Sequence, residues 1–293
     1  MTRFAIAGIQ QQLSAAEPNL ERMSAKLDEL MMIFPWVQMV VFSELAAHGP
    51  NTKHAQAIGG PVEDTFRSWA RKHGIWLLPG STFERADDDR IYNMSCVIDP
   101  GGEVVCRYRK MFPFRPYEVG VEAGDAFTVF DVPEVGRFGV SICYDMWFPE
   151  TTRTLASLGA EVILHPTMTG TIDRDVELSI VRASAAQNQC FFFDINGLGD
   201  GGSGRSIIVG PDGDVLCEAG SATQLMPLEI DLDRVRHSRQ RGLLGLCQTL
   251  KSFRDRRVQF DVYAKEPGNT EYTEYLDTLG PLEKPARPPR QGK

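Results

Sequence analysis

Residues 139–150 read GVSICYDMWFPE, a stretch typical of a strand that runs into a helix with Cys143 at the corner. Residues 138–142 suit a buried strand, and Phe-Pro-Glu at 148–150 favours a helix start. A side chain at such a corner lies near the unpaired N–H groups of the helix amino end, which favour a thiolate. From this stretch alone two interpretations stay open, a nucleophile or a small buried apolar side chain.

Two further strand-like runs end in a charged residue. Residues 37–44 (VQMVVFSE) are apolar up to Glu44, and residues 103–110 (EVVCRYRK) end in Lys110. Taken alone, both charges could be solvated strand ends. Together with Cys143 they place a carboxylate, an ammonium group and a thiol at three strand ends, which points to one catalytic site.

In these stretches the chain resembles the nitrilase superfamily of carbon–nitrogen hydrolases, whose triad is Glu, Lys and Cys in this chain order. The segments RKMFPFRPYE (109–118) and SICYDMWFPE (141–150) look like those of aliphatic amidases and formamidases. The likeness runs from the first strand to about residue 263. It implies a four-layer α-β-β-α sandwich, whereas the alternation of strands and helices by itself predicts only an α/β fold.

The resemblance also implies roles for these residues. Amide hydrolysis needs a nucleophile, a proton carrier, and donors where the carbonyl oxygen becomes negative. Cys143 would attack to form a thioester, and Glu44 would carry the proton to the leaving nitrogen. Lys110 and the backbone N–H of Tyr144 would hold the oxyanion.

A second glutamate completes the expected catalytic set. Glu118 falls where the amidase branch carries a glutamate that binds the lysine and helps to position substrate. Glu122 is the competing candidate, but the PFRPYE spacing favours Glu118. With two carboxylates, an ammonium group and a thiol in one pocket, titration would belong to the cluster and not to single residues.

The residues around the nucleophile predict the substrate pocket. Cys-Tyr-Asp at 143–145 resembles the amide and carbamoyl hydrolases, whereas nitrilases carry Cys-Trp-Glu. Tyr144 is expected to bind substrate. Trp147 stands where many relatives have arginine, which suggests a more apolar wall. Thr167 is a further candidate for the pocket, while His165 is expected to be structural.

Composition narrows the function classes. The chain has 293 residues, 42% of them apolar and 24% charged, with a formal charge of −8. The negative charge argues against nucleic acid or an anionic membrane surface as a partner. The six cysteines form no C-x-x-C pair, and the histidines are scattered, so neither disulfides, nor a metal, nor a cofactor is expected. No secretory signal or membrane span is recognised, which favours a cytoplasmic protein.

The chain reads as one domain followed by a tail. A hydrolase domain is expected over residues 1–263, with a basic C-terminal arm from about 232, and a Pro-rich extended or disordered tail over 264–293. Helices are expected over 62–73, 148–158 and about 174–188, and a single strand over 75–83. The Gly-rich turn at 199–204 is expected to be a hairpin connection and not a phosphate loop.

Three functions remain open at this point. The first is a thiol amidase acting on a small aliphatic amide or N-carbamoyl compound. The second is a nitrilase with the same triad, and the third is a non-catalytic interaction protein on this fold. The resemblance also suggests a homodimer or larger oligomer, in which the arm either packs on its own domain or crosses to a partner.

Overall fold

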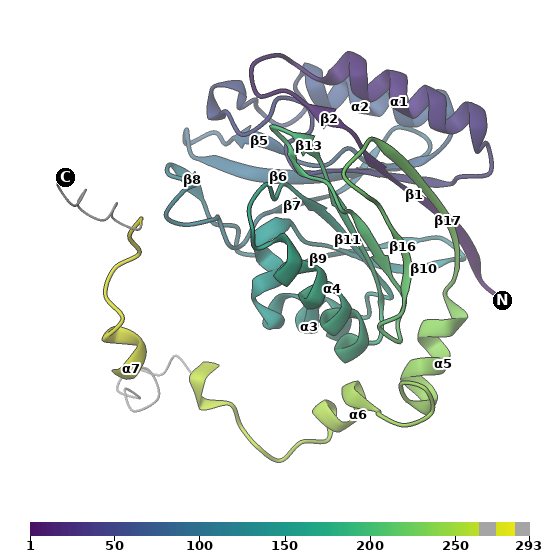
Figure 1. Cartoon of the computed structure of the whole chain (residues 1–293), viewed down its shortest axis with the longest axis vertical. Coiled ribbons are helices and arrows are strands. Elements are labelled where there is room, and N and C mark those ends of the chain that lie inside the picture. Colours follow the sequence, from purple (N-terminus) through teal and green to yellow (C-terminus); the bar gives the residue numbers. More distant parts are fainter. Residues whose placement is uncertain (264–273, 285–293) are drawn as a thin grey trace, which may run out of the picture.

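The computed structural model describes residues 1–263 and 274–284, and two β-sheets packed face to face form its centre (Figure 1). The first sheet has the order β17-β1-β3-β4-β6-β5, with β7 and β8 also pairing with β6. Its strands are β1 (Arg3–Gln10), β3 (Met39–Phe42), β4 (Trp76–Leu78), β5 (Thr82–Arg85), β6 (Ile91–Ile98), β7 (Val104–Arg109), β8 (Val121–Glu122) and β17 (Gln224–Asp231).

The second sheet has the order β16-β15-β12-β11-β10-β9. Its strands are β9 (Thr128–Val132), β10 (Gly136–Val140), β11 (Val162–Thr167), β12 (Phe191–Asn196), β15 (Ile207–Val209) and β16 (Val215–Glu218). A small third sheet joins β2 (Gln12–Leu13), β13 (Leu198–Gly199) and β14 (Gly202–Ser203). The β13–β14 pair confirms a hairpin at the Gly-rich turn.

Helices cover the two outer faces of the paired sheets (Figure 1). One apolar cluster joins the first sheet to α1 (Leu20–Ile33) and α2 (Pro61–His73). Another joins the second sheet to α3 (Pro149–Ser157) and α4 (Arg174–Asn188), and the largest lies between the sheets. The layers are therefore α-β-β-α, which confirms the architecture that the resemblance implied.

The strand β3 shows why the central strands read as unbroken apolar runs. Met39 and Val41 pack into the core between the sheets, whereas Val40 and Phe42 pack beneath the helices. Alternate side chains of a strand point to opposite faces, and here both faces are covered. Burial continues past the end of β3, since the polar residues Ser43 and Glu44 that follow it are each 1% exposed.

The single strand expected over 75–83 is wrong. The structure divides it into β4 and β5, and Gly80 lies between them with φ of +85°. A Cβ at this position would stand 1.9 Å from the carbonyl oxygen of Ser43. Glycine therefore allows the chain to turn directly beside the end of β3.

The expected arm begins with α5 (Asp233–Arg241) and α6 (Thr249–Arg254), which lie against the chain's own second sheet and α4. Arg239 Nε donates to the carbonyl of Gln189 at 3.1 Å, and Thr249 Oγ1 donates to that of Gln187 at 2.9 Å. Most of the expected tail lies outside the described residues, but residues 274–284 include a one-turn helix, α7 (Glu274–Asp277). Within the described ranges, the helices are all too short or too polar to span a bilayer.

Candidate active site

The ends of three strands bring the predicted catalytic residues together. Glu44 follows β3 of the first sheet, Lys110 directly follows β7, and Cys143 is the first residue of the 3-10 helix η2 (Cys143–Trp147) after β10 of the second sheet. The N–H of Glu44 donates to the carbonyl of Thr167 at 3.2 Å, so the end of β3 is tied to the end of β11. The site thus lies where the two sheets meet at their strand ends.

Lys110 is the centre of a buried charged cluster. Its Nζ donates to Glu44 Oε1 and to Glu118 Oε2, each at 2.9 Å. Asn93, fully buried on β6, donates through Nδ2 to the same Glu44 oxygen at 2.8 Å. The Lys110 ammonium has three hydrogens, so these two bonds leave one for a substrate. Asn93 was not predicted, because a buried asparagine within a strand gives no local sign of its role.

Cys143 is held in an unusual backbone conformation. Its φ is +46°, a region that non-glycine residues seldom adopt and that needs support from the surroundings. Asp145 supplies that support, because its carboxylate accepts from the Ile142 N–H at 2.8 Å and from the Tyr108 hydroxyl at 2.6 Å. It also accepts from the Phe112 N–H at 2.9 Å. Asp145 therefore fastens η2, which begins with Cys143, to the segment that carries Lys110, a role that the sequence analysis missed.

Burial sets the protonation of the site. It raises the pKa of Glu44; the negative charge of Glu118 raises this pKa too, whereas the positive charge of Lys110 lowers it. Burial alone would lower the pKa of Lys110, but the negative groups around it raise that pKa above its ordinary value. Burial and the charge of Glu44 raise the pKa of the Cys143 thiol, which outweighs the helix-start effect expected from the sequence. Cys143 therefore rests as a thiol, and a carboxylate of raised pKa beside it is suited to take its proton.

A pocket of about 310 Å³ opens onto these groups. Its lining is Glu44, Pro50, Thr52, Phe83, Lys110, Phe114, Tyr117, Glu118, Val119, Val121, Cys143 and Met168. The four residues predicted as catalytic all contribute to it, and Glu122 does not. The remaining wall is mainly aliphatic and aromatic, so the pocket offers reactive groups at one place and apolar contact around them.

The three residues predicted to bind substrate lie outside this lining. The Tyr144 ring packs against Phe114 with ring centroids 5.0 Å apart. Trp147 donates through Nε1 to Glu177 Oε1 at 3.4 Å, on the side of α4. Thr167 is fully buried and contributes its carbonyl to the bond with Glu44. Of these three side chains, that of Tyr144 is in contact with a lining residue, since Phe114 lines the pocket.

His165 is also kept away from the pocket. It is fully buried on β11, and its Nδ1 lies 2.7 Å from the hydroxyl oxygen of Ser141. Its ring packs against Phe192. In the part of the chain that the structure describes, no group of three or more His, Cys, Asp or Glu side chains is arranged to hold a metal ion.

Comparisons with known proteins agree with this geometry. A deaminated glutathione amidase of Dictyostelium discoideum is 31% identical over 211 residues, which is 65% of this chain and 72% of that protein. An (R)-stereoselective amidase of Pseudomonas sp. is 34% identical over 193 residues, covering 64% and 68%. The solved structure of Saccharomyces cerevisiae Nit3, a member of branch 10 of the nitrilase superfamily, superposes with a TM-score of 0.75 at 26% identity over 82% of this chain and 94% of that one.

The strongest of these comparisons concerns the family as a whole. The family model described as carbon-nitrogen hydrolase matches residues 3–240, which include both sheets and all four residues of the charged pocket. This match and the Nit3 superposition confirm the resemblance inferred from the strand ends. The chain belongs to the carbon–nitrogen hydrolase family.

Proposed function

We propose that this carbon–nitrogen hydrolase cleaves a small uncharged aliphatic amide, or an N-carbamoyl compound, through a thioester on Cys143 with release of ammonia. The observation that carries the proposal is the meeting of Glu44, Lys110, Glu118 and Cys143 on one pocket. A non-catalytic interaction protein would not need three charged side chains converging on a thiol.

The geometry supports a sequence of steps. Cys143 Sγ attacks the amide carbon while Glu44 takes the thiol proton. The third Lys110 hydrogen and the Tyr144 N–H, in the first turn of η2 where N–H groups lack helical partners, bind the oxyanion. Glu44 then passes the proton to the nitrogen, the C–N bond breaks, and ammonia leaves. Water activated by Glu44 cleaves the thioester, giving the acid and the free thiol.

The pocket charge supports an uncharged acyl group. The lining contains two carboxylates and one ammonium group, and Lys110 already binds both carboxylates. A substrate carboxylate would therefore meet net negative charge and no free cation among these lining residues, while an alkyl group would meet the aliphatic and aromatic wall.

A matched substrate pair tests this proposal. Butyramide ends in a methyl group where succinamate carries a carboxylate. The rates of ammonia release from the two therefore measure the effect of a substrate charge at nearly constant size. We expect butyramide to be turned over and succinamate to be much poorer, with both activities lost in Cys143→Ala. Including N-carbamoyl amino acids and butyronitrile in the panel distinguishes the carbamoyl hydrolase and the nitrilase. Preference for succinamate or for the nitrile would contradict the assignment.

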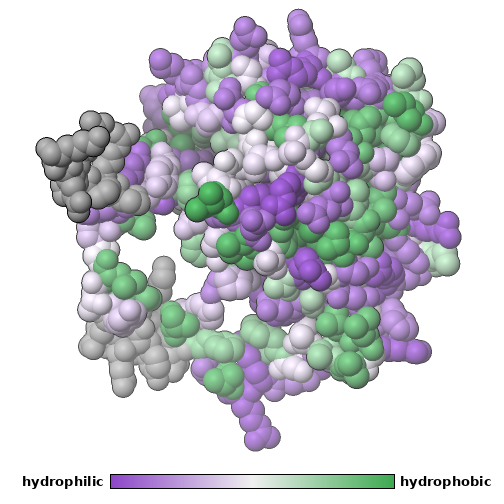
Figure 2. All heavy atoms as spheres, in the orientation of Figure 1, coloured by the Kyte–Doolittle hydropathy of each residue, from purple (hydrophilic) through white to green (hydrophobic). Residues whose placement is uncertain are grey.

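We also propose that the active form is a homo-oligomer, with α3 and α4 at the contact. Leu155, Val181 and Ala185 are buried inside the chain and need no partner. Leu158, directly after α3, and Val176 on α4 remain 43% and 49% exposed. Figure 2 shows further apolar surface patches between polar ones, and a two-fold partner is the commonest way to cover such a face.

Light scattering decides the oligomeric state. A mass near 32.6 kDa for fully active protein would refute the proposal. Val176→Asp on α4 should weaken association, whereas Met32→Asp, an equally drastic change at an exposed site on α1, should not. Deletion from residue 241 onward should weaken association only when the arm crosses to the partner.

The cysteines support a reducing compartment. All six are free in the structure, which fits a cytoplasmic protein. We therefore propose cytoplasmic localisation, to be checked by fractionation of the source cells.

A further inference from the structure

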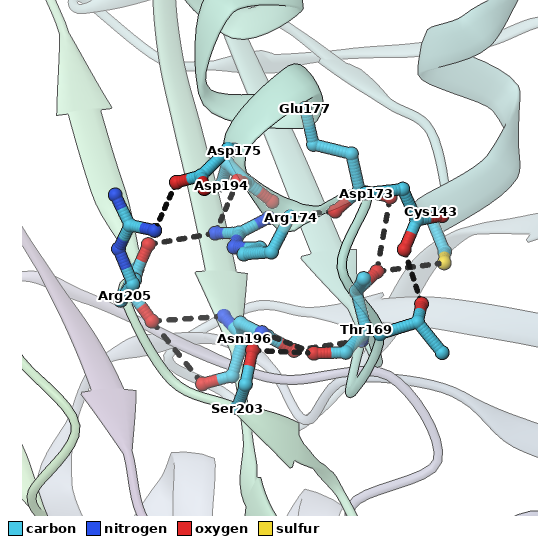
Figure 3. A network of polar contacts seen from close by, with 12 residues as sticks. Cys143, Thr169, Asp173, Arg174, Asp175, Glu177, Asp194, Asn196, Ser203 and Arg205 are labelled. Carbon is cyan, nitrogen blue, oxygen red and sulfur yellow. Dashed lines mark hydrogen bonds and ion pairs between the residues drawn. The ribbon is translucent and has the colours of Figure 1, made fainter.

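A second buried ionic cluster, formed by Arg174, Glu177 and Asp194, lies near Cys143 (Figure 3). Arg174 and Glu177 come from the first turn of α4, and Asp194 comes from β12. The Arg174 guanidinium donates to Glu177 Oε2 at 3.0 Å and lies 2.7 Å from Asp194 Oδ2. The side chains of all three are at most 3% exposed. Two carboxylates share one guanidinium, so the cluster carries a net negative charge.

Thr169 connects this cluster to Cys143. Asn196 holds the Thr169 backbone on both sides, because its Oδ1 accepts from the Thr169 N–H and its Nδ2 donates to the Thr169 carbonyl, each at 2.9 Å. The Thr169 hydroxyl donates to Glu177 Oε1 at 3.0 Å. An ionised carboxylate only accepts hydrogen bonds, so the hydroxyl hydrogen must point to Glu177.

The second contact of the Thr169 hydroxyl oxygen is with the nucleophile, Cys143. Thr169 Oγ1 lies 3.9 Å from Cys143 Sγ, within the range of a hydrogen bond to sulfur. Since the hydroxyl hydrogen is committed to Glu177, the oxygen can act toward Cys143 only as an acceptor of the S–H. Figure 3 shows this chain of contacts from Glu177 through Thr169 to the sulfur.

We propose that Glu177 is a positioning residue for the nucleophile. By fixing the Thr169 hydroxyl as an acceptor, it holds Cys143 as an oriented thiol until Glu44 takes the proton. This inference rests on the proposed function, in which Cys143 is the attacking group. It extends that function by giving the thiol two partners with different tasks, one that orients it and one that deprotonates it.

Several titratable groups surround the thiol, and they come from every element packed around it. Those groups are Glu44 after β3, Lys110 after β7, Glu118 in the following loop, Asp145 in η2, His165 on β11, and the Arg174, Glu177 and Asp194 cluster. Of these, burial keeps His165 neutral and lowers its pKa to about 4. After burial itself, the charges of Glu44 and Glu177 raise the pKa of the Cys143 thiol, and Lys110 opposes them.

The pH dependence of Cys143 alkylation tests the inference without any amide substrate. Glu177→Gln keeps the size and an acceptor for Thr169 but removes the charge, while Arg174 keeps its pairing with Asp194. Iodoacetamide labelling of Cys143, followed by mass spectrometry as a function of pH, should show a lower midpoint in this variant than in the wild-type protein, because a charge that raises the pKa of the thiol is gone. Glu161→Gln, which loses a carboxylate paired with Arg236 far from the thiol, is the matched control and should keep the wild-type midpoint.

The Thr169 variants test the hydroxyl itself. Thr169→Val keeps the shape and removes the oxygen, so kcat should fall about tenfold with KM little changed. Thr169→Ser restores the hydroxyl and should recover most of that loss. A purely structural role would lower stability in the variants but would leave the alkylation midpoint in place.

The outcomes separate this inference from the function on which it rests. If Cys143 of the wild-type protein is not labelled ahead of the other cysteines, the proposed thiol chemistry fails and the inference fails with it. If Cys143 is labelled but Glu177→Gln keeps the wild-type midpoint, or Thr169→Val keeps wild-type kcat, only the inference is overturned.

Discussion

Replacing Lys110 by methionine tests the electrostatic basis of the site through stability alone. Methionine is of similar length and is uncharged, so the change leaves Glu44 and Glu118 without their shared cation. Glu44 is the costly one, because its side chain is 2% exposed whereas that of Glu118 is 17% exposed and partly solvated. Removing one partner of a buried pair typically costs about 3–5 kcal/mol. We expect Lys110→Met to lower the free energy of unfolding by about 3 kcal/mol near neutral pH, since Asn93 still donates to Glu44.

A second substitution isolates the unpaired charge as the cause. Lys110→Met combined with Glu44→Gln removes both charges and leaves the Asn93 amide an acceptor. The double variant should regain at least about half of the lost stability, because Glu44 is no longer a buried unpaired charge and the Glu118 carboxylate that still lacks its cation is 17% exposed. If the double variant is as unstable as Lys110→Met, the loss comes from packing and not from charge.

The pH dependence gives an independent check with a defined sign. Burial already raises the pKa of Glu44, and loss of Lys110 raises it further. A carboxyl group whose folded pKa is raised binds more protons in the native state than in the unfolded state. Its relative stabilising effect is present below the ordinary pKa and is lost as pH rises through the folded pKa.

Lys110→Met should therefore be less destabilised at about pH 5 than at about pH 8, relative to wild type at the same pH. Urea unfolding followed by tryptophan fluorescence measures both values. A cost below about 1 kcal/mol, or the same cost at both pH values, would refute the reasoning.

Three further predictions concern the remaining groups of the site. Cys143→Ala should fold normally and lose essentially all turnover, and iodoacetamide should label Cys143 of the wild-type protein ahead of the five other cysteines; uniform labelling would contradict the assignment. Glu118→Gln should lower turnover while Cys143 can still be alkylated, because it removes the negative charge that pairs with Lys110 and leaves the nucleophile in place. Wild-type turnover in this variant would move the assignment to Glu122. Burial lowers the pKa of His165 from 6.5 to about 4. The buried neutral imidazole therefore contributes about 3 kcal/mol to the free energy of unfolding, which is present above pH 6.5 and is lost as pH falls toward 4. His165→Gln should flatten this part of the stability profile, measured by urea unfolding at several pH values.

Much of the fold follows from local patterns in the sequence. The expected helix over about 174–188 coincides with α4, and the apolar runs before Glu44, Lys110 and Cys143 are β3, β7 and β10. The spacing of the apolar residues and the residues that start or stop a helix determine these elements, because both signals lie within a few residues of each other in the sequence. The strand break at Gly80 was missed, since its cause is the carbonyl of Ser43 from another strand.

The partners of the predicted catalytic residues were decided by the tertiary structure. Asn93, Asp145, Thr169 and Glu177 lie in a strand, a 3-10 helix, a loop and an α-helix, with no local pattern that marks them. Each acts through one or two hydrogen bonds to residues from other elements, such as Asn93 to Glu44 and Thr169 to Glu177. The resemblance to the nitrilase superfamily indicated Glu, Lys and Cys as a set, and each of them ends a strand-like run of the sequence. Protonation depends on burial and on charges that converge only after folding, so the resting thiol of Cys143 could not be read from the helix start beside it.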